Sequence, residues 1–458
     1  HVKLADEAIH IGKPPSLESY LRADSILVAA RAAGCEAVHP VYGFLAENED
    51  FARDCADSGI TFIGPSGSAI ALMGSKTASR KAVETAGVRV VPGSPEAVES
   101  VDEASAWGRR IGFPLLIKAS AGGGGKGMRV VRNEDDLEAA FRAAVGEAQS
   151  SFGDSSVYIE RYLEKPRHIE IQVLLDQEGK GIHLGERECS IQRRHQKLVE
   201  ESPSPVVDEE FREQLGAAAL KVAQVAGYYN AGTVEFLVEE LESGELRHYF
   251  LEMNTRLQVE HPVTELVTGL DLVREQILIA SGQPLRKKPD RIKLQGAAIE
   301  CRIYAEDPSQ NFFPSPGVIS TLFEPSGPGV RNDSGVCAGF EIPLEYDPLI
   351  SKLVTFGADR SEAICRMRRA LSEYKVGGVK TTIPFFQRLL SHPAFLAGEL
   401  NTHFIEDHGL ISDQVISEHM DLPAIAGVVD YFLRSKKPSA ITSKRISAWK
   451  DHGREDWW

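Results

Sequence analysis

Long hydrophobic runs, an excess of positive charge and closely spaced cysteines are all missing from this sequence. No apolar run approaches the ~18 residues of a membrane span, which argues against a helical membrane protein. The 51 lysines and arginines are outnumbered by 66 aspartates and glutamates, so the net charge is −15 and the chain as a whole is a poor nucleic-acid binder. The six cysteines form no C-x-x-C pair, which indicates reduced thiols and a cytoplasmic or mitochondrial-matrix location.

A starting Met and the layout of a signal peptide are also missing, so we expect the sequence to begin within a domain. Its length predicts about three domains at ~150 residues each. With 42% hydrophobic and 26% charged residues, the chain is able to build a large core. The first 75 residues alternate short apolar runs with helical stretches, which favours an α/β layer, with helices over 25–34 and 51–59 and a strand over 60–65.

Two features divide the second half of the chain. The Pro/Lys-rich segment 282–293 is the best boundary, and the last folded unit ends near Leu410. Between them, residues 297–307 alternate apolar and polar side chains, as in a half-exposed antiparallel strand. After them, the polar run 434–445 predicts a linker.

A pair of carboxylates is predicted on one β-hairpin. Residues 233–254 read as strand, turn and strand, with Ser243-Gly244 as the turn. A two-residue turn there places Glu235 directly opposite Glu252, and opposed residues share a face. Like charges so placed repel, and a Mg²⁺ or Mn²⁺ ion bound through oxygen ligands removes that repulsion. The alternative is a solvated polar face on an edge hairpin.

The same alternation extends that face along the chain. Asn254 adds a carbonyl oxygen to the metal site, and Arg256, Gln258 and Glu260 follow at every second position. A site that holds a metal and phosphates also needs cations and hydrogen-bond donors for a second, anionic reactant, and a base to activate it. These residue types form such a set.

A run of glycines lies between two predicted strands in 118–131. Gly122, Gly124 and Gly127 match G-x-G-x-x-G, but that dinucleotide-binding pattern needs a helix after the loop, and here a strand follows. No Gly-Lys-Ser/Thr occurs, so the loop is no Walker A motif. Its bare backbone N–H groups suit phosphate oxygens, with Lys118 as a fixed cation beside them. The alternative is a mobile linker.

Together these motifs resemble the biotin carboxylases of the ATP-grasp superfamily over about residues 1–410. The matching segments are MGSK (73–76), KASAGGGGKGMR (118–129), IERYLEKPRHIEIQ (159–172), ERECSIQRRHQKLVEESPSP (186–205), EFLVE (235–239), EMNTRLQVEHPVTE (252–265), AIECRIYAEDP (298–308), FPSPGVI (313–319) and YDPLISKL (346–353). The resemblance implies an α/β (α+β) ATP-grasp fold. Its parts would be a partial N-terminal α/β domain (1–75), an ATP-grasp domain (76–288) with a mobile glycine-rich lid at about 90–162, a mainly antiparallel C-terminal β domain (289–410) and a tail (411–458).

The resemblance also implies a role for each matching residue. ATP would be bound by Lys76, Lys118, Gly123, Gly124, Gly125, Met128, Glu160, Arg161, Leu163, His168, Gln192 and His195. Family members often carry Lys at the position of Arg161, where the contact is largely through backbone. Mg²⁺ or Mn²⁺ would be held by Glu235, Glu252 and Asn254. Bicarbonate and biotin would be bound by Lys197, Arg256, Gln258, Val259 and Arg331, and the catalytic groups would be Glu260, Arg256, Lys197 and Arg331.

The implied reaction is the ATP-dependent carboxylation of biotin by bicarbonate, which gives N-carboxybiotin, ADP and phosphate. Glu260 would deprotonate bicarbonate, carboxyphosphate would form and release CO₂, and Arg331 would stabilise the biotin enolate. Taken without the resemblance, Arg331 reads as a surface ion pair, Lys197 as part of a basic run, and His168 and His195 as packed or solvated histidines.

Two departures from the family bear on partners. The family's first strand, with its Asn-Arg-Gly-Glu motif, is absent before His1, and no methionine neighbours a lysine, so there is no Met-Lys-Met biotinylation motif. Biotin would therefore arrive on a carrier domain or protein, and the product would pass to a carboxyltransferase domain or subunit. We expect a homo-oligomer or part of a larger acyl-CoA or pyruvate carboxylase. The competing hypotheses are another carboxyl-activating ATP-grasp ligase and a truncated, inactive segment that serves as an assembly surface.

Overall fold

The N-terminal residues form a small α/β layer. The computed structural model describes residues 4–119, 128–285 and 292–411. Here β1 (Ala37–Val38) and β2 (Thr61–Phe62) pair in parallel beside α1 (Ala23–Ala32) and α2 (Glu49–Asp57). The side chain of Asn48 caps α2 by accepting from the Phe51 N–H at 2.7 Å. The helices and strand predicted over 25–34, 51–59 and 60–65 are thus confirmed within a few residues. The 3₁₀ helix η1 (Ser16–Glu18) precedes α1, η2 (Phe44–Glu47) lies between β1 and α2, and α3 (Gly67–Gly74) and α4 (Lys76–Thr85) follow β2.

A three-stranded sheet carries the glycine loop. Its order is β4 (Met128–Val131), β3 (Leu115–Ala119), β5 (Val157–Arg161), and both pairings are antiparallel. Helices α5 (Val101–Ile111) and α6 (Leu137–Phe152) pack on it through a core that includes Leu115, Ile117 and Phe141. A strand follows the loop, as predicted, because Lys118 pairs with Met128 in the β3–β4 hairpin. Gly123, Gly124 and Gly125 lie outside the described residues.

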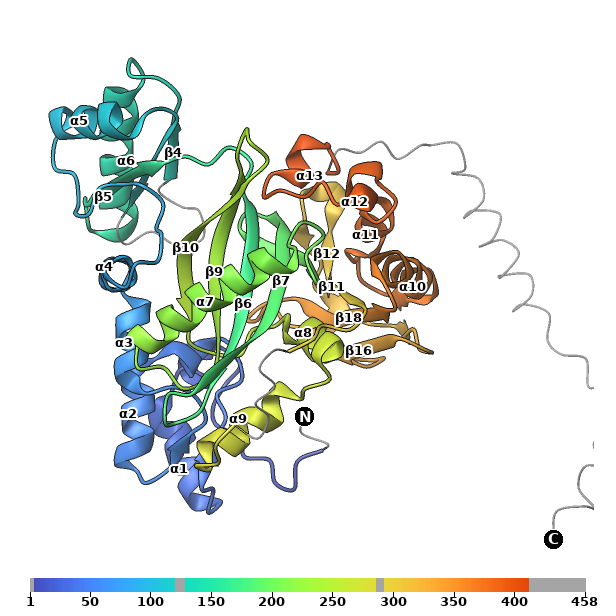
Figure 1. Ribbon diagram of the computed structural model, residues 1–458. Helices are drawn as coiled ribbons and strands as arrows, with labels where there is room; N and C mark the ends of the chain where they lie inside the picture. The colour runs from blue at the N-terminus through green and yellow to red at the C-terminus, as the bar shows by residue number, and fades with distance from the viewer. Residues whose placement is uncertain (1–3, 120–127, 286–291, 412–458) are drawn as a thin grey trace, which may run out of the picture. The chain divides into compact units, whose positions relative to one another are not determined.

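An antiparallel sheet of eight strands organises the rest of the described chain. Its order is β10 (Leu246–Asn254), β9 (Asn230–Glu240), β6 (Arg167–Leu175), β7 (Gly181–Arg193), β8 (Gln196–Ser202), β11 (Ala297–Tyr304), β18 (Leu349–Gly357), β16 (Val330–Ser334). Figure 1 shows α7 (Glu209–Val225) lying across this sheet, where Phe211, Leu215 and Val222 pack on Ile171 and Phe236. Helices α8 (His261–Thr268) and α9 (Leu272–Ala280) follow β10 in the chain.

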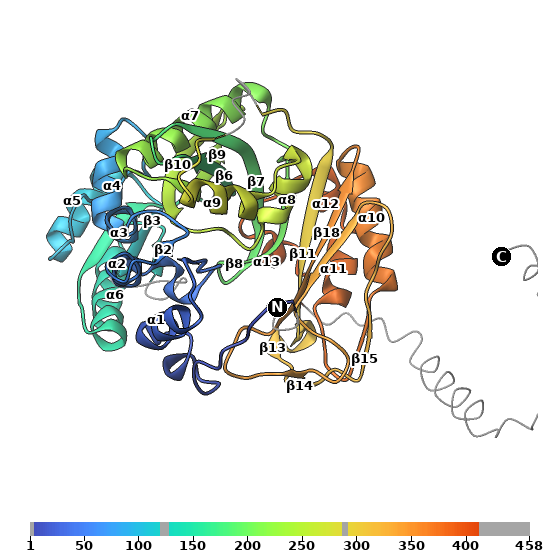
Figure 2. The ribbon, with the colours of Figure 1, turned by 90° about the horizontal axis from the view of Figure 1, so that it is seen from below.

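Figure 2 shows β11 and β18 beside α10 (Arg360–Glu373) and α11 (Ile383–Leu389), and buried side chains of these elements form the C-terminal core. The remaining elements here are β12 (Glu306–Asp307), η3 (Pro308–Gln310), β13 (Phe313–Pro314), β14 (Gly317–Val318), β15 (Thr321–Phe323), β17 (Glu341–Ile342), β19 (Lys375–Gly377), α12 (Pro393–Ala397) and α13 (Phe404–Asp407). The prediction of a half-exposed strand at 297–307 is wrong, because every residue of β11 is buried. One face packs in the C-terminal core, and the other carries Glu300 and Arg302 toward further protein rather than water.

The β9–β10 hairpin reaches the predicted pairing by a different route. Its turn has three residues, 242–244, because the Leu241 N–H donates to the Glu245 carbonyl. By itself, this longer turn would shift the pairing of β9 with β10 by one residue from the predicted register. A bulge at Leu251 restores it, so Glu235 does face Glu252. The prediction of a two-residue turn is wrong, while the predicted pair is confirmed.

Candidate active site

Glu260 lies where the chain leaves β10 and enters α8, and it is completely buried. Its Oε1 accepts from Lys197 Nζ at 2.6 Å, and its Oε2 accepts from Arg302 Nη2 at 2.9 Å. Burial alone would raise the pKa of this carboxyl, but the two cations hold the pKa well below its ordinary range. Glu260 is therefore an ionised carboxylate, held by charge-assisted hydrogen bonds on both oxygens.

Lys197 lies at the centre of the site. It projects from β8 just after the β7–β8 turn, and its Nζ contacts Glu170 at 2.5 Å and Glu235 at 2.8 Å in addition to Glu260. Burial opposes the charged form, yet these carboxylates raise the pKa of Lys197 well above its usual value. One ammonium thus links acids from three separate elements, β6, β9 and the start of α8.

Three carboxylates stand in a row across neighbouring strands. Glu170 on β6 pairs directly with Glu235 on β9, which pairs with Glu252 on β10. Direct partners share a face, and it is opposite to the face that α7 covers through Val234 and Phe236. Partial removal from water and the charge of Glu235 raise the pKa of Glu252. Sequence reasoning missed Glu170, although its alternation with buried Ile169 and Ile171 is the signal that marks it.

The groups around Glu235 differ in part from the predicted metal ligands. His168 Nε2 lies 3.0 Å from Glu235 Oε2, and Asn254 Nδ2 donates to Glu235 Oε1 at 2.9 Å. Among the described residues, His168, Glu170 and Glu235 place one possible ligand atom each within 4.8 Å of one another. Asn254 therefore presents its amide N–H to the carboxylate here, whereas the prediction used its carbonyl oxygen.

Arg256, Gln258 and Val259 line the segment between β10 and α8. Arg256 Nε donates to Glu47 Oε2 at 2.8 Å, so the N-terminal layer reaches this segment. Gln258 Nε2 is buried and has no partner among the described residues. The Val259 carbonyl accepts from Lys352 Nζ at 3.0 Å, which fixes that peptide. The segment thus offers a guanidinium and an unused amide donor beside Glu260.

The described residues that we predicted to bind ATP lie on or beside the three-stranded sheet, on α4 and along the large sheet. Lys118 Nζ pairs with Glu160 Oε1 at 2.5 Å, and Arg161 pairs with Glu239 at 2.6 Å. Leu163 packs against Tyr249 of β10. The remaining predicted residues lie at the start of α4 (Lys76), the start of β4 (Met128), on β7 (Gln192) and in the β7–β8 turn (His195).

His195 takes a left-handed backbone conformation, with φ 64°. Partial burial lowers its pKa, and the charges of His168 and Lys118 act in the same direction. A non-glycine residue in this conformation is strained, and such strain is common at binding sites.

Arg331 on β16 is held against α8 through Glu265, which lies five residues after Glu260. Its Nη1 donates to Glu265 Oε2 at 2.7 Å, and its Nε and Nη2 donate to Asp333 at 2.9 and 2.8 Å. Glu265 also faces His261 Nδ1 at 3.1 Å. Arg331 is half-buried, and its guanidinium is held in one orientation by two carboxylates.

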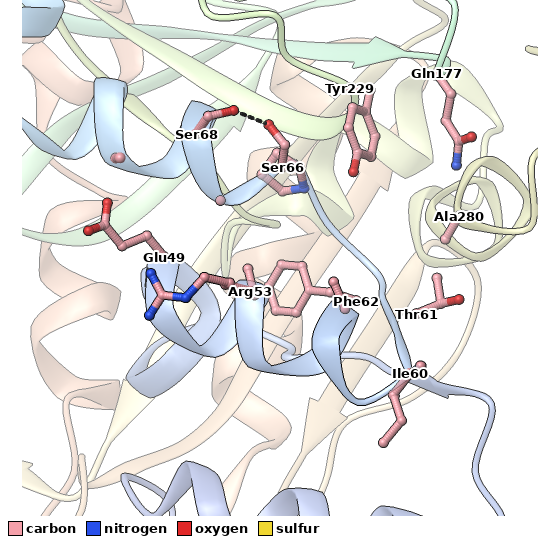
Figure 3. Close-up of a pocket in the computed structure, with 16 residues that line it drawn as sticks. Glu49, Arg53, Ile60, Thr61, Phe62, Ser66, Ser68, Gln177, Tyr229 and Ala280 are labelled. Carbon is pink, nitrogen blue, oxygen red and sulfur yellow. Dashed lines mark hydrogen bonds between the residues drawn. The ribbon is translucent and has the colours of Figure 1, made fainter.

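A cavity of about 830 Å³ lies elsewhere, between the N-terminal layer and the loop before β9 (Figure 3). Arg53, Phe62, Ser66, Gln177 and Tyr229 are among its lining residues. None of the residues predicted to act in the reaction lines it. Converging charged side chains, rather than this cavity, define the candidate active site.

Three known families match the chain in order. These are "Biotin carboxylase, N-terminal domain" over residues 1–70, "Carbamoyl-phosphate synthase L chain, ATP binding domain" over 75–288, and "Biotin carboxylase C-terminal domain" over 300–407. Biotin carboxylase 1 of Bacillus subtilis is 53% identical over 411 residues, which cover 90% of this chain and 91% of that protein. The chain belongs to the biotin carboxylase family.

Other members support the same conclusion. The biotin carboxylase of Haemophilus influenzae is 51% identical, and the match covers 89% of this chain and 90% of that one. A solved structure shows the biotin carboxylase domain dimer of Hydrogenobacter thermophilus 2-oxoglutarate carboxylase with MgADP, ADP and bicarbonate. It is 48% identical, covers 90% of each chain and has a TM-score of 0.83. The predictions of the family, of an ATP-grasp fold and of an enzyme are confirmed, and the inactive assembly segment is not favoured. Among the described residues, no helix has the length and apolar character that crossing a bilayer requires.

Proposed function

We propose that this biotin carboxylase uses ATP to activate bicarbonate at Glu260 and then carboxylates biotin beside Arg331. The observation that carries the proposal is the placement of Glu260. It is a buried, ionised carboxylate that shares Lys197 with Glu235, the carboxylate paired with Glu252. A base, a cation for an anionic substrate and an acidic cluster for a metal–nucleotide complex therefore meet around one ammonium.

The acidic row suits a magnesium or manganese ion. Glu235 and Glu252 offer carboxylate oxygens from directly opposed positions, and oxygen donors are those that Mg²⁺ prefers. Asn254 would join them once its amide is turned to present oxygen. When bound, the ion supplies positive charge against the phosphates of ATP. Lys76, Lys118, Met128 and the glycines at 123–125 would hold the phosphates, and Glu160, Arg161, Leu163, His168, Gln192 and His195 would hold the rest of the nucleotide.

Bicarbonate fits between Lys197 and the 256–259 segment. The guanidinium of Arg256, the unused amide donor of Gln258 and the Val259 N–H would bind its oxygens. When bicarbonate draws Lys197 toward itself, Glu260 loses part of its stabilisation and its proton affinity rises. That change makes Glu260 a better base for the step in which bicarbonate attacks the γ-phosphorus of ATP.

Arg331 would then act in the second half of the reaction. Carboxyphosphate releases CO₂ and phosphate, and phosphate takes the ureido proton of biotin. The planar guanidinium, already fixed by Glu265 and Asp333, stabilises the negative ureido oxygen while the ring nitrogen attacks CO₂. Arg331 lies on β16, and its partner Glu265 lies on α8, five residues after the proposed base Glu260.

The wider setting is also a proposal. Members of the family work with a biotin carrier and a carboxyltransferase, and we propose that this chain does so as a homo-oligomer or as part of a larger carboxylase complex. Six unpaired cysteines support a reducing, cytoplasmic location. We propose divisions at 1–75, 76–288 and 289–410, with 411–458 as the tail, and the family matches over 1–70, 75–288 and 300–407 support them.

Bicarbonate-dependent ATP hydrolysis stimulated by free biotin tests the function. The assay uses purified chain, MgATP and a coupled ADP readout, with bicarbonate and biotin each omitted in turn. Stimulation by both is expected. Stimulation by ammonia or by an aminoimidazole ribotide, without response to biotin, would reject the proposal in favour of another ATP-grasp ligase.

A further inference from the structure

Two acidic side chains behind Glu260 have no part in the reaction described so far. Glu200 lies on β8 and Glu300 on β11, and the two residues are directly opposed across the β8–β11 pairing. Both are completely buried. Directly opposed like charges in an interior are strongly destabilising unless they are neutralised.

Arg302 connects this pair to the base. Its guanidinium donates to Glu200 Oε1 at 2.7 Å through Nε, and its Nη2 donates to Glu260 Oε2 at 2.9 Å. One guanidinium is therefore divided between the two carboxylates. Whatever changes the charge near Glu200 changes how strongly Arg302 holds Glu260.

Hydrogen-bond donors are missing around the second acid. Glu200 Oε2 and both oxygens of Glu300 are buried without a partner among the described residues. Lys352, on the neighbouring strand β18, is directed to the Val259 carbonyl at 3.0 Å and to His261 at 3.5 Å. The charged groups that face the pair are Arg302 on β11, Lys352 on β18, Lys197 on β8 and Glu260 at the start of α8.

A buried carboxylate without donors is stable only when it is protonated. Burial and the charge of Glu200 raise the pKa of Glu300 well above its usual value, and burial raises the pKa of Glu200 to about 7. One proton placed between the two acids would give Glu200 Oε2 and one oxygen of Glu300 a partner, with an O–H donor on one and an acceptor on the other.

We propose that Glu200 and Glu300 share one proton and form a positioning pair that keeps Arg302 on Glu260. With the proton in place, the pair carries a single charge and Arg302 spans Glu200 and Glu260. When the proton is lost, two charges face Arg302 and draw it away from Glu260. The consequence for catalysis rests on the proposed role of Glu260, whereas the shared proton does not.

Infrared spectroscopy of the full chain detects the proton directly. At pH 8, exposed carboxyls are ionised, so a carbonyl band of a protonated carboxylic acid reports a buried one. The band is expected in the wild type, lost in Glu300→Gln and retained in Glu306→Gln. Glu306 is a matched control, since it is another buried acid whose pKa is raised, to about 7, but it does not contact Arg302 or Glu260 among the described residues. A wild type without the band would overturn the proposal, and this measurement requires no variant to fold.

The pH profile of kcat/KM for bicarbonate tests the positioning role. The wild type should lose activity by about tenfold per pH unit above the point where the shared proton leaves, because Arg302 then no longer holds Glu260 in the orientation that the reaction needs. Glu300→Gln keeps a neutral donor beside Glu200, so its alkaline limb should move upward by about one pH unit or more. Glu300→Asp, which still titrates, and Glu306→Gln should keep the limb. An unchanged limb in a folded Glu300→Gln variant would overturn the role.

The two proposals fail in different ways. A chain with no bicarbonate-dependent ATP hydrolysis but with the infrared band would refute the proposed function and leave the shared proton standing. A chain that turns over bicarbonate but lacks the band would refute only the pair.

Discussion

Glu235 and Glu252 are directly opposed on β9 and β10, and Lys197 contacts the first of them at 2.8 Å. Opposed carboxylates repel; Glu170 is also paired with Arg187 and Glu260 with Arg302, whereas Glu252 forms no ion pair among the described residues. The site is therefore built with spare negative charge, which is the condition for taking up a divalent cation with ATP.

Glu252→Gln should weaken the use of Mg²⁺, because it removes one of the two opposed charges. We expect bicarbonate-dependent ATP hydrolysis to fall about 10- to 100-fold at fixed Mg²⁺, with a higher Mg²⁺ concentration at half-maximal rate. A Mg²⁺ titration measures this. Glu240→Gln is the matched control, since Glu240 lies on the same hairpin but is exposed near the turn. Equal Mg²⁺ curves for Glu252→Gln and the wild type would contradict the metal role.

Glu260→Gln should abolish the deprotonation of bicarbonate while keeping the shape of the side chain. The rate of bicarbonate-dependent ATP hydrolysis is expected to drop about 100-fold or more. The amide oxygen still accepts from Lys197 or Arg302, so nucleotide affinity, measured by calorimetry, should change little. A variant that keeps its turnover would exclude Glu260 as the base.

Arg331→Met should separate the two halves of the reaction. ATP hydrolysis that depends on bicarbonate alone should persist, because Arg331 contacts Glu265 and Asp333 rather than Glu260. The stimulation by biotin, measured as additional ADP release and as carboxybiotin, should fall about 100-fold. Asn332→Ala on the same strand serves as the control. Loss of both activities together would instead point to a structural role for Arg331.

Glu265 gives a pH dependence of stability. Burial opposes ionisation, but His261 and Arg331 lower the pKa of Glu265 from 4.5 to about 2. A lowered pKa in the folded state contributes stability above pH 4.5, and this contribution is lost as the pH falls toward 2. Glu265→Gln should reduce stability at pH 7 by roughly 2 kcal/mol after allowance for solvent screening. Urea unfolding of both proteins at pH 7 and pH 3 measures this, and a difference that does not shrink at pH 3 would refute it.

Alternation along strands made much of the site predictable. Glu235, Glu252 and Asn254 were found because polar side chains repeat at every second position beside buried ones. The hairpin register came out right because a longer turn and a bulge at Leu251 cancel, and neither has a distinct signal in the sequence. Distances across strands depend on such irregularities, which only the packed structure decides.

Long-range neighbours were not predictable in this way. Arg302 is 42 residues from Glu260 in sequence yet contacts it at 2.9 Å, and the alternation of 297–307 was interpreted as exposure to water. Alternation with a period of two shows that a strand has one apolar and one polar face. It does not show what covers the polar face. Here a second layer of charged side chains covers it, which also explains why Glu200 and Glu300 were missed.

The pairing of β8 with β11 makes a single sheet out of segments that match two separate families. Cutting the chain at the Pro/Lys-rich segment would leave an open strand edge on each fragment, and such edges associate with other chains. It would also leave Lys197 and Glu260 on one fragment and Arg302 on the other. For this enzyme, then, a matched family boundary is a poor guide to where a working half could be separated.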